Sequence, residues 1–259
     1  MASPRRAAPV PRVRLNRERV IAAAIVIADA GGLEALTMRR LGDDLNVEAM
    51  SIYNHVANKD DLINGMADAI FGEIELPSHS DDWKSAIRKR SISFREVLAR
   101  HPWATTVRDS GTNPGPATLR HHDRVIGTFR NGGFSVEKTA HAFSAVDSYI
   151  YGFAMQEKSL PFTTPEETAA MAAIMLAQLP RGEYPYLAEL TADHVLTPGY
   201  FYGDEFLVGL DLVLDGLETM LETDQRRGSQ PPHSRAATRP SAHAVTLNRR
   251  VSPDETVHS

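Results

Sequence analysis

The sequence predicts an all-α protein, and three observations lead to this prediction. Apolar residues recur with helical spacing from about residue 17 to residue 222, no segment alternates apolar and polar residues like a half-buried strand, and helix-capping residues lie at the ends of the periodic segments. The chain has 259 residues and is 42% hydrophobic, so it can bury a substantial core. It has no cysteine, which excludes disulfides and Cys-based metal sites.

Charge is distributed unevenly along the chain. The formal net charge is −5, but residues 1–60 carry +2, residues 61–223 carry −10 and residues 224–259 carry +3. The acidity belongs to the middle of the chain, so the first sixty residues remain free to face phosphate groups.

Composition divides the chain into four parts. Residues 1–14 hold four arginines and three prolines and are predicted to be a disordered basic arm, and residues 224–259, rich in Pro, Ser, Arg and His, a disordered tail. Residues 15–76 and 77–223 are predicted to be a small and a larger helical domain. No apolar run is long enough to span a bilayer, so we expect a cytoplasmic protein without a membrane partner.

The small domain is predicted to contain four helical segments, the fourth leading into the larger domain. They cover about 17–30, 38–45, 49–55 and 59–74, with Asn16, Thr37 and Asn58 as N-caps. In the larger domain we expect helices at about 82–100, 116–131, 135–157, 165–179 and 204–222, with Ser135 and Thr164 as caps. Residues 101–115 and 180–203, which contain several prolines, are predicted to be mostly loop.

Residues 37–59 have the pattern of a helix-turn-helix. Five apolar side chains can form the inner face of two short helices joined by a tight turn at Asn46, namely Leu41, Leu45, Val47, Ile52 and Val56. On the outside, Arg, Lys, Tyr and Ser suit phosphate contacts, whereas Met, Ala and Asn suit base edges and thymine methyls. The candidate DNA-contact residues are Thr37, Arg39, Ala49, Met50, Ser51, Tyr53, Asn54, His55 and Lys59. The alternative for this segment alone is a helical hairpin with an ordinary polar face.

The same segment resembles the signature of the tetracycline-repressor family. The resemblance runs without a gap from Thr37 through Leu62 and rests on Tyr53, His55, Val56, Asn58, Lys59 and Leu62. It implies an all-helical homodimer that binds a palindromic operator and releases it when the larger domain binds a small molecule. It also implies that Arg39, Ser51, Tyr53, His55 and Lys59 contact DNA and that Ala49 and Met50 lie where bases are read.

A weaker resemblance to the tetracycline repressors continues into the larger domain, through Trp83, Phe94, His101 and the run that begins at Gly133. The helices at 135–157 and 204–222 have apolar surfaces too wide for one contact, so we expect them to pair with their symmetry mates. The alternative is a helix wholly inside one subunit. The fourth helix is expected to be the only link between the two domains.

Tetracycline repressors hold their drug as a magnesium chelate, but the resemblance places Arg108 and Gln156 where the metal-binding His and Glu would be. Arg90 and Val125 replace two polar drug contacts, and Phe94 is retained. We therefore expect no metal and no cofactor, and a mostly hydrophobic effector, with two arginines available for an anionic group. The candidate effector residues are Arg90, Phe94, Trp103, Arg108, Tyr149, Tyr151, Met155 and Gln156. The alternative is that the arginines are surface ion-pair partners and the aromatics are core.

Two other functional classes remain as alternatives: a DNA-binding factor without an effector, and an all-helical enzyme. Four histidines could suggest catalysis, His101, His121, His122 and His141, but the adjacent pair is expected to diverge on a helix. The sequence has no HExxH, no GxSxG and no phosphate-binding glycine loop. The sequence therefore favours a ligand-responsive transcriptional repressor and not an enzyme.

Overall fold

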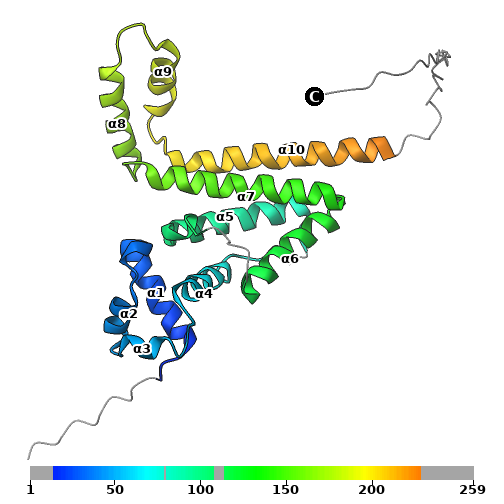
Figure 1. Cartoon of the computed structure of the whole chain (residues 1–259). Helices are drawn as coiled ribbons and strands as arrows, with labels where there is room; N and C mark the ends of the chain where they lie inside the picture. Colours follow the sequence, from blue (N-terminus) through cyan, green and yellow to red (C-terminus); the bar gives the residue numbers. More distant parts are fainter. Residues whose placement is uncertain (1–13, 79, 108–113, 229–259) are drawn as a thin grey trace, which may run out of the picture.

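The computed structural model describes residues 14–78, 80–107 and 114–228, and within these ranges it contains helices and no strand. The prediction of an all-α fold is confirmed. Four helices form the small N-terminal unit, α1 (Arg17–Gly31), α2 (Met38–Leu45), α3 (Ala49–Ile52) and α4 (Lys59–Phe71) (Figure 1). The larger body contains α5 (Trp83–Arg100), α6 (Pro116–Asn131), α7 (Val136–Ser159), α8 (Pro165–Gln178), α9 (Pro185–Leu190) and α10 (Glu205–Gly228).

Most helix boundaries follow the predicted caps, because capping is a local interaction. Asn16, Thr37, Asn58, Ser135 and Thr164 each accept a hydrogen bond from the backbone three residues on. Two helices are shorter than predicted: α3 ends at Ile52 and not near residue 55, and α4 ends at Phe71 and not near residue 74. None of the helices in the described ranges is both long and apolar enough to cross a membrane.

Both segments predicted as loop contain helical turns. Residues 180–203 include α9 and a π-helical turn at Thr191–Val195, and residues 101–115 begin with a 3-10 turn at Pro102–Thr105. The prolines misled the prediction because proline is accepted in the first turn of a helix, which is where Pro102 and Pro185 lie. Helix α10 reaches Gly228, inside the range assigned to the tail. Residues 1–13 of the basic arm and 229–259 of the tail lie outside the described residues.

The turn between α2 and α3 depends on two residues. Asn46 ends α2 in the left-handed conformation, with φ 54° and ψ 47°. Gly42 lets the two helices approach closely, since a Cβ there would lie 2.9 Å from the carbonyl oxygen of Val47. This geometry matches the predicted tight turn at Asn46.

An ion pair fixes the start of α1 to the start of α4. The Arg17 guanidinium donates to both carboxylate oxygens of Asp61, at 2.7 and 2.8 Å, and to the carbonyl oxygen of His55 at 3.0 Å. The backbone N–H of Ala57 donates to the same carboxylate at 2.8 Å. The turn that follows α3 is therefore held between two longer helices.

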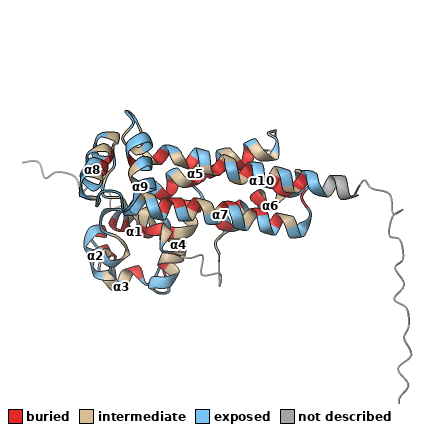
Figure 2. Ribbon diagram, turned by 90° about the horizontal axis from the view of Figure 1, so that it is seen from above, coloured by how far each residue is buried: buried red, intermediate tan, exposed pale blue. Residues whose placement is uncertain are grey.

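Inside the larger body, α7 packs against α5, α6 and α10 (Figures 1 and 2). Its apolar stripe is taken up within the subunit, because Val146, Ile150 and Phe153 are all buried. This stripe of α7 therefore lies inside one subunit, as the alternative prediction had it.

Helix α10 has two apolar sides with different surroundings. One side faces α5 and α7 and is buried: Phe206, Leu210, Leu214, Leu217 and Leu221. Val208 and Leu212 point the other way and are 59% and 70% exposed. The neighbouring hairpin of α8 and α9 also carries exposed apolar side chains: Met171, Ile174, Met175, Tyr184, Tyr186, Leu187 and Leu190. Exposed surface that a second subunit could cover therefore lies on the outer side of α10, on the α8–α9 hairpin and on the side of α7 that carries small exposed residues: Ala140, Ser144, Ala145, Ser148 and Gly152.

Replacing Asp61 by Asn should lower the free energy of unfolding at neutral pH by about 1 kcal/mol, because both partners are partly exposed and solvent screens the pair. The Arg17 hydrogen bonds, followed by the Ala57 N–H, lower the pKa of Asp61 from 3.8 to about 2. The stabilisation is therefore full above the unfolded-state pKa and is lost as the pH falls from 3.8 towards 2. Urea unfolding of the wild type and the variant across this range measures the loss.

Asp60→Asn is the matched control, since it removes the same charge from the same helical turn and Asp60 makes no ion pair with any described residue. A gap between wild type and Asp61→Asn that stays constant from neutral to acid pH would contradict this account of the ion pair.

The double substitution Val208→Glu and Leu212→Glu should convert the expected homodimer into folded monomers, because it places charges on an exposed apolar side and leaves the core intact. Sedimentation velocity measures the assembly and circular dichroism the fold. Leu119→Glu on α6, at a side chain that is 55% exposed, is the control and should leave the dimer unchanged. A double variant that dimerises as tightly as the wild type would refute the assigned surface. Glu at Leu210 or Leu217 would instead damage the core.

Candidate functional site

The predicted DNA-contact residues lie on the outside of the helix-turn-helix, and none of them is buried. Met50 is 74% exposed at the middle of α3, while Ile52 of the same helix is fully buried. Thr37 is exposed, although its hydroxyl also caps α2 by accepting from the N–H of Arg40 at 3.2 Å. Arg39 and Lys59 are exposed in the first turns of α2 and α4. Of the remaining candidates, Tyr53 and Asn54 are exposed, and Ala49, Ser51 and His55 are half-buried.

The predicted effector residues do not form a single group. Arg90, Phe94 and Tyr151 come together in the core, where the Phe94 and Tyr151 rings are 5.1 Å apart and the Arg90 guanidinium lies 4.8 Å from the Phe94 ring centre. Trp103 is buried elsewhere and donates to Asp29 of α1 at 2.7 Å. Arg108 lies outside the described residues.

Two other candidates on α7 face the start of α10 and not that group. The Tyr149 hydroxyl donates to the carbonyl oxygen of Phe206 at 2.9 Å, and Gln156 accepts from the Tyr202 hydroxyl at 2.8 Å. These two positions are seven residues apart, which places them on one side of the helix, towards the start of α10. Met155 is 54% exposed.

Arg90 is the centre of a buried polar cluster. Its side chain is fully buried, and it donates through Nε and Nη2 to Nε2 of His121, at 3.0 and 2.8 Å, and through Nη1 to Asp147 at 2.6 Å. The alternative of a surface ion-pair partner is thus wrong for Arg90, which is an ion-pair partner inside the core. The signal was present in the sequence, because Arg90 falls on the stripe of α5 that also carries Ile87 and Phe94.

His121 and His122 do not diverge as expected. Their ring centres are 6.1 Å apart, and both rings lie edge-on to Phe71, the last residue of α4, at 5.4 and 5.5 Å. Burial, followed by the charge of Arg90, lowers the pKa of His121 from 6.5 to about 3. His121 is therefore neutral at physiological pH.

Helix α4 contacts the body directly beside this cluster. The Phe71 ring lies 5.7 Å from Phe94, which joins the two domains through aromatic packing. Helix α6 has no cap from the residue before it, Gly115, and Asp68 of α4 accepts instead from the N–H and the hydroxyl of Thr118, at 2.8 and 2.9 Å. A Cβ at Gly115 would lie 2.2 Å from the Asp68 carboxyl carbon, so a larger residue there would displace the Asp68 carboxylate from Thr118.

A second connection between the domains runs through α1. Asp29 accepts from Trp103 Nε1 at 2.7 Å and lies 2.8 Å from Nδ1 of His101, and both partners belong to the segment that follows α5. The expectation that the fourth helix alone joins the two domains is therefore wrong. Asp29 is 72 and 74 residues away from His101 and Trp103, which is why local patterns did not reveal the contact.

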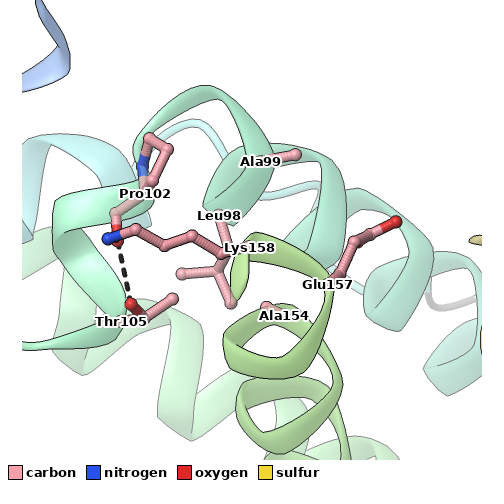
Figure 3. A pocket seen from close by; sticks show the side chains of 7 residues that line it. All are labelled: Leu98, Ala99, Pro102, Thr105, Ala154, Glu157 and Lys158. Carbon is pink, nitrogen blue, oxygen red and sulfur yellow. Dashed lines mark hydrogen bonds between the residues drawn. The ribbon is translucent and has the colours of Figure 1, made fainter. Parts of the chain in front are cut away.

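A small cleft of about 170 Å³ lies where the ends of α5 and α7 meet the 3-10 turn (Figure 3). Leu98 and Ala154 form its apolar part, and Lys158 donates to the carbonyl oxygen of Pro102 at 3.1 Å. None of the predicted effector residues lines this cleft. Within the described ranges, no three His, Asp or Glu side chains are grouped so that they could hold a metal ion.

Comparison with known proteins gives one consistent result. Residues 76–221 match the model of the tetracycline repressor-like C-terminal domain. The chain is 32% identical over 237 residues to the HTH-type transcriptional repressor DrrR1 of Streptomyces coeruleorubidus, covering 88% of this chain and 86% of that protein. It is 29% identical over 212 residues to the class D tetracycline repressor of Escherichia coli, covering 80% and 91%.

Solved structures agree with these relatives. The crystal structure of ActR, a protein from Streptomyces coelicolor, in complex with actinorhodin superposes with a TM-score of 0.67 at 26% identity, covering 81% of this chain and 99% of ActR. ActR in complex with (S)-DNPA superposes with a TM-score of 0.66 at 25% identity, covering 79% and 98%. With the helix-turn-helix, the helical body and these relatives taken together, the chain belongs to the tetracycline-repressor family of transcription regulators.

Proposed function

We propose that this regulator is a cytoplasmic repressor that binds a palindromic operator through the helix-turn-helix and releases it when a small molecule binds in the body. The observation that carries the proposal is the contact of Phe71 at the end of α4 with Phe94 and His121. A ligand that rearranges this aromatic group acts directly on α4, which begins at the DNA-contact residue Lys59 and holds the turn after α3 through Asp61.

On the DNA, the nine exposed or half-buried candidates would have different roles. Arg39 and Lys59 would contact phosphates, because their charges are exposed and the Arg17 charge is already paired with Asp61. Met50 would lie in the major groove, where an apolar side chain can contact thymine methyls. The Arg17–Asp61 pair would set the position of α3 relative to α4.

The effector would bind around the Arg90, Phe94 and Tyr151 group, where aromatic rings surround a polar centre. ActR binds actinorhodin, and we propose a comparable small molecule, mostly apolar, for this chain. The histidine and the carboxylate of this cluster, His121 and Asp147, are both bonded to Arg90, so we propose that binding requires no magnesium. Ligand binding would shift the population towards a subunit arrangement with another spacing of the two recognition helices, by no more than its differential affinity.

Removing one exposed charge from the DNA face should weaken binding to every DNA sequence and make its salt dependence less steep. For Arg39→Ala or Lys59→Ala, the slope of log affinity against log salt should fall by about one unit. Fluorescence anisotropy with an operator selected in vitro from random DNA measures both quantities. Arg181→Ala removes an exposed charge from the α8–α9 connection, at the opposite end of the molecule (Figure 1), and should change neither. Unchanged affinity in both DNA-face variants would rule out this docking face.

Release of the operator by an aromatic ligand should proceed equally well with and without EDTA. Phe94→Leu should raise the ligand concentration needed for release roughly fivefold, since a lost aromatic contact is worth about 1 kcal/mol. It should leave operator affinity without ligand nearly unchanged. Phe129→Leu is the control, because Phe129 is equally buried on α6 but packs with Trp83 and Phe134. A strict magnesium requirement would disprove the proposed mode of binding, and absence of release by any ligand would favour a factor without an effector.

A further inference from the structure

One polar atom in the core lacks a partner. The side chain of His121 is fully buried, and its Nδ1 has no hydrogen-bond partner among the described residues. Buried polar groups are nearly always hydrogen-bonded. An unpartnered polar atom at a candidate ligand site therefore indicates that the ligand could supply the missing hydrogen-bond partner. The neighbouring rings of Phe71, Phe94 and His122 leave this atom in apolar and aromatic surroundings, with ring-centre distances of 5.4, 6.2 and 6.1 Å.

The contacts of Arg90 determine which hydrogen-bonding group is left over. A guanidinium can only donate, so Nε2 of His121 must accept, and in the neutral ring the proton is then on Nδ1. The unpartnered group is therefore a single N–H donor. It is held in one orientation, because Arg90 binds the opposite side of the ring.

The charge of the same cluster is already balanced. Arg90 is paired with Asp147 at 2.6 Å, and His121 is neutral, so the three side chains together carry no net charge. An anionic ligand would have to compete with the Asp147 carboxylate for Arg90. A neutral oxygen acceptor would complete the cluster without disturbing any existing bond.

We propose that the effector of this regulator is an uncharged aromatic compound that presents a carbonyl oxygen to the Nδ1–H of His121. The inference rests on the proposed function and makes it more specific, since the effector expected from the sequence had two arginines available for an anionic group. A ligand that reaches Nδ1 must also contact Phe71, since both lie in the same aromatic group. The hydrogen bond thus positions the ligand against the end of α4.

Three naphthalene probes of similar size test the inference on the intact dimer: acetonaphthone, with a ketone oxygen, ethylnaphthalene, without an acceptor, and naphthoate, with a negative charge. The ketone should bind roughly tenfold more tightly than the hydrocarbon, which is the worth of one well-placed buried hydrogen bond. Calorimetry measures the affinities. In long-range ¹H–¹⁵N spectra the His121 ring should show the Nδ1–H tautomer, and its Nδ1 signal should move with the ketone and not with the hydrocarbon.

Two substitutions separate the two nitrogen positions of the ring. His121→Gln places an amide near Nε2, which can still accept from Arg90 but leaves no donor at Nδ1, so the preference for the ketone should disappear. His121→Asn places an amide near Nδ1, so the preference should persist. The wild-type probe series and spectra need no variant, so they decide the matter even if a substituted protein fails to fold.

Equal binding of ketone and hydrocarbon, tightest binding of naphthoate, or binding of none of the three probes would each overturn the inference. The proposed function has a separate readout, release of the selected operator. If the ketone binds more tightly than the hydrocarbon but does not release the operator, the proposed switch is wrong and the contact with His121 is supported. Release by a ligand that leaves the His121 signals unchanged would support the switch and refute the contact.

Discussion

The buried charge of Arg90 is the constraint on which the arrangement of the body depends. A guanidinium excluded from water is strongly destabilising unless its donors are satisfied and its charge is paired. His121 and Asp147 meet this requirement, and they come from α6 and α7, while Arg90 belongs to α5. Three helices are therefore fixed in position by one side chain, and the aromatic rings that exclude water from it include Phe71 of α4.

The DNA-binding unit is attached to the body by contacts of different chemistry, and α4 makes both kinds, because Asp68 accepts from Thr118 while Phe71 packs against Phe94. Phe71 packs against aromatic rings in a contact that has no strict direction, so it can adjust when its neighbours move. Asp29 instead accepts an oriented hydrogen bond from Trp103 at 2.7 Å. A rotation of the small unit about the Asp29 contact would change the packing of Phe71, which suits a switch that must keep its halves connected in both states.

The sequence predicted those features that depend on neighbouring residues. The caps at Asn16, Thr37 and Ser135 are set by bonds that span three residues, and the family signature is one continuous segment. Arg90 was among the predicted effector residues, but its partners His121 and Asp147 were not. They are 31 and 57 residues away from Arg90, and no local pattern joins them. Gln156 was proposed from the family resemblance and Tyr149 from its aromatic ring, and neither signal tells on which side of α7 a residue lies. Pro185 was interpreted as a breaker, although proline also begins helices.

The start of α6 is completed by a residue from another domain. The residue before α6, Gly115, has no side chain that could accept from the N–H of Thr118, and Asp68 of α4 accepts instead. The negative charge of Asp68 also suits the positive end of the helix dipole. When α4 moves away, this first turn loses its cap and its amide protons become easier to exchange with solvent. The rate of deuterium uptake at the amide of Thr118 therefore reports how closely the DNA-binding unit is docked on the body.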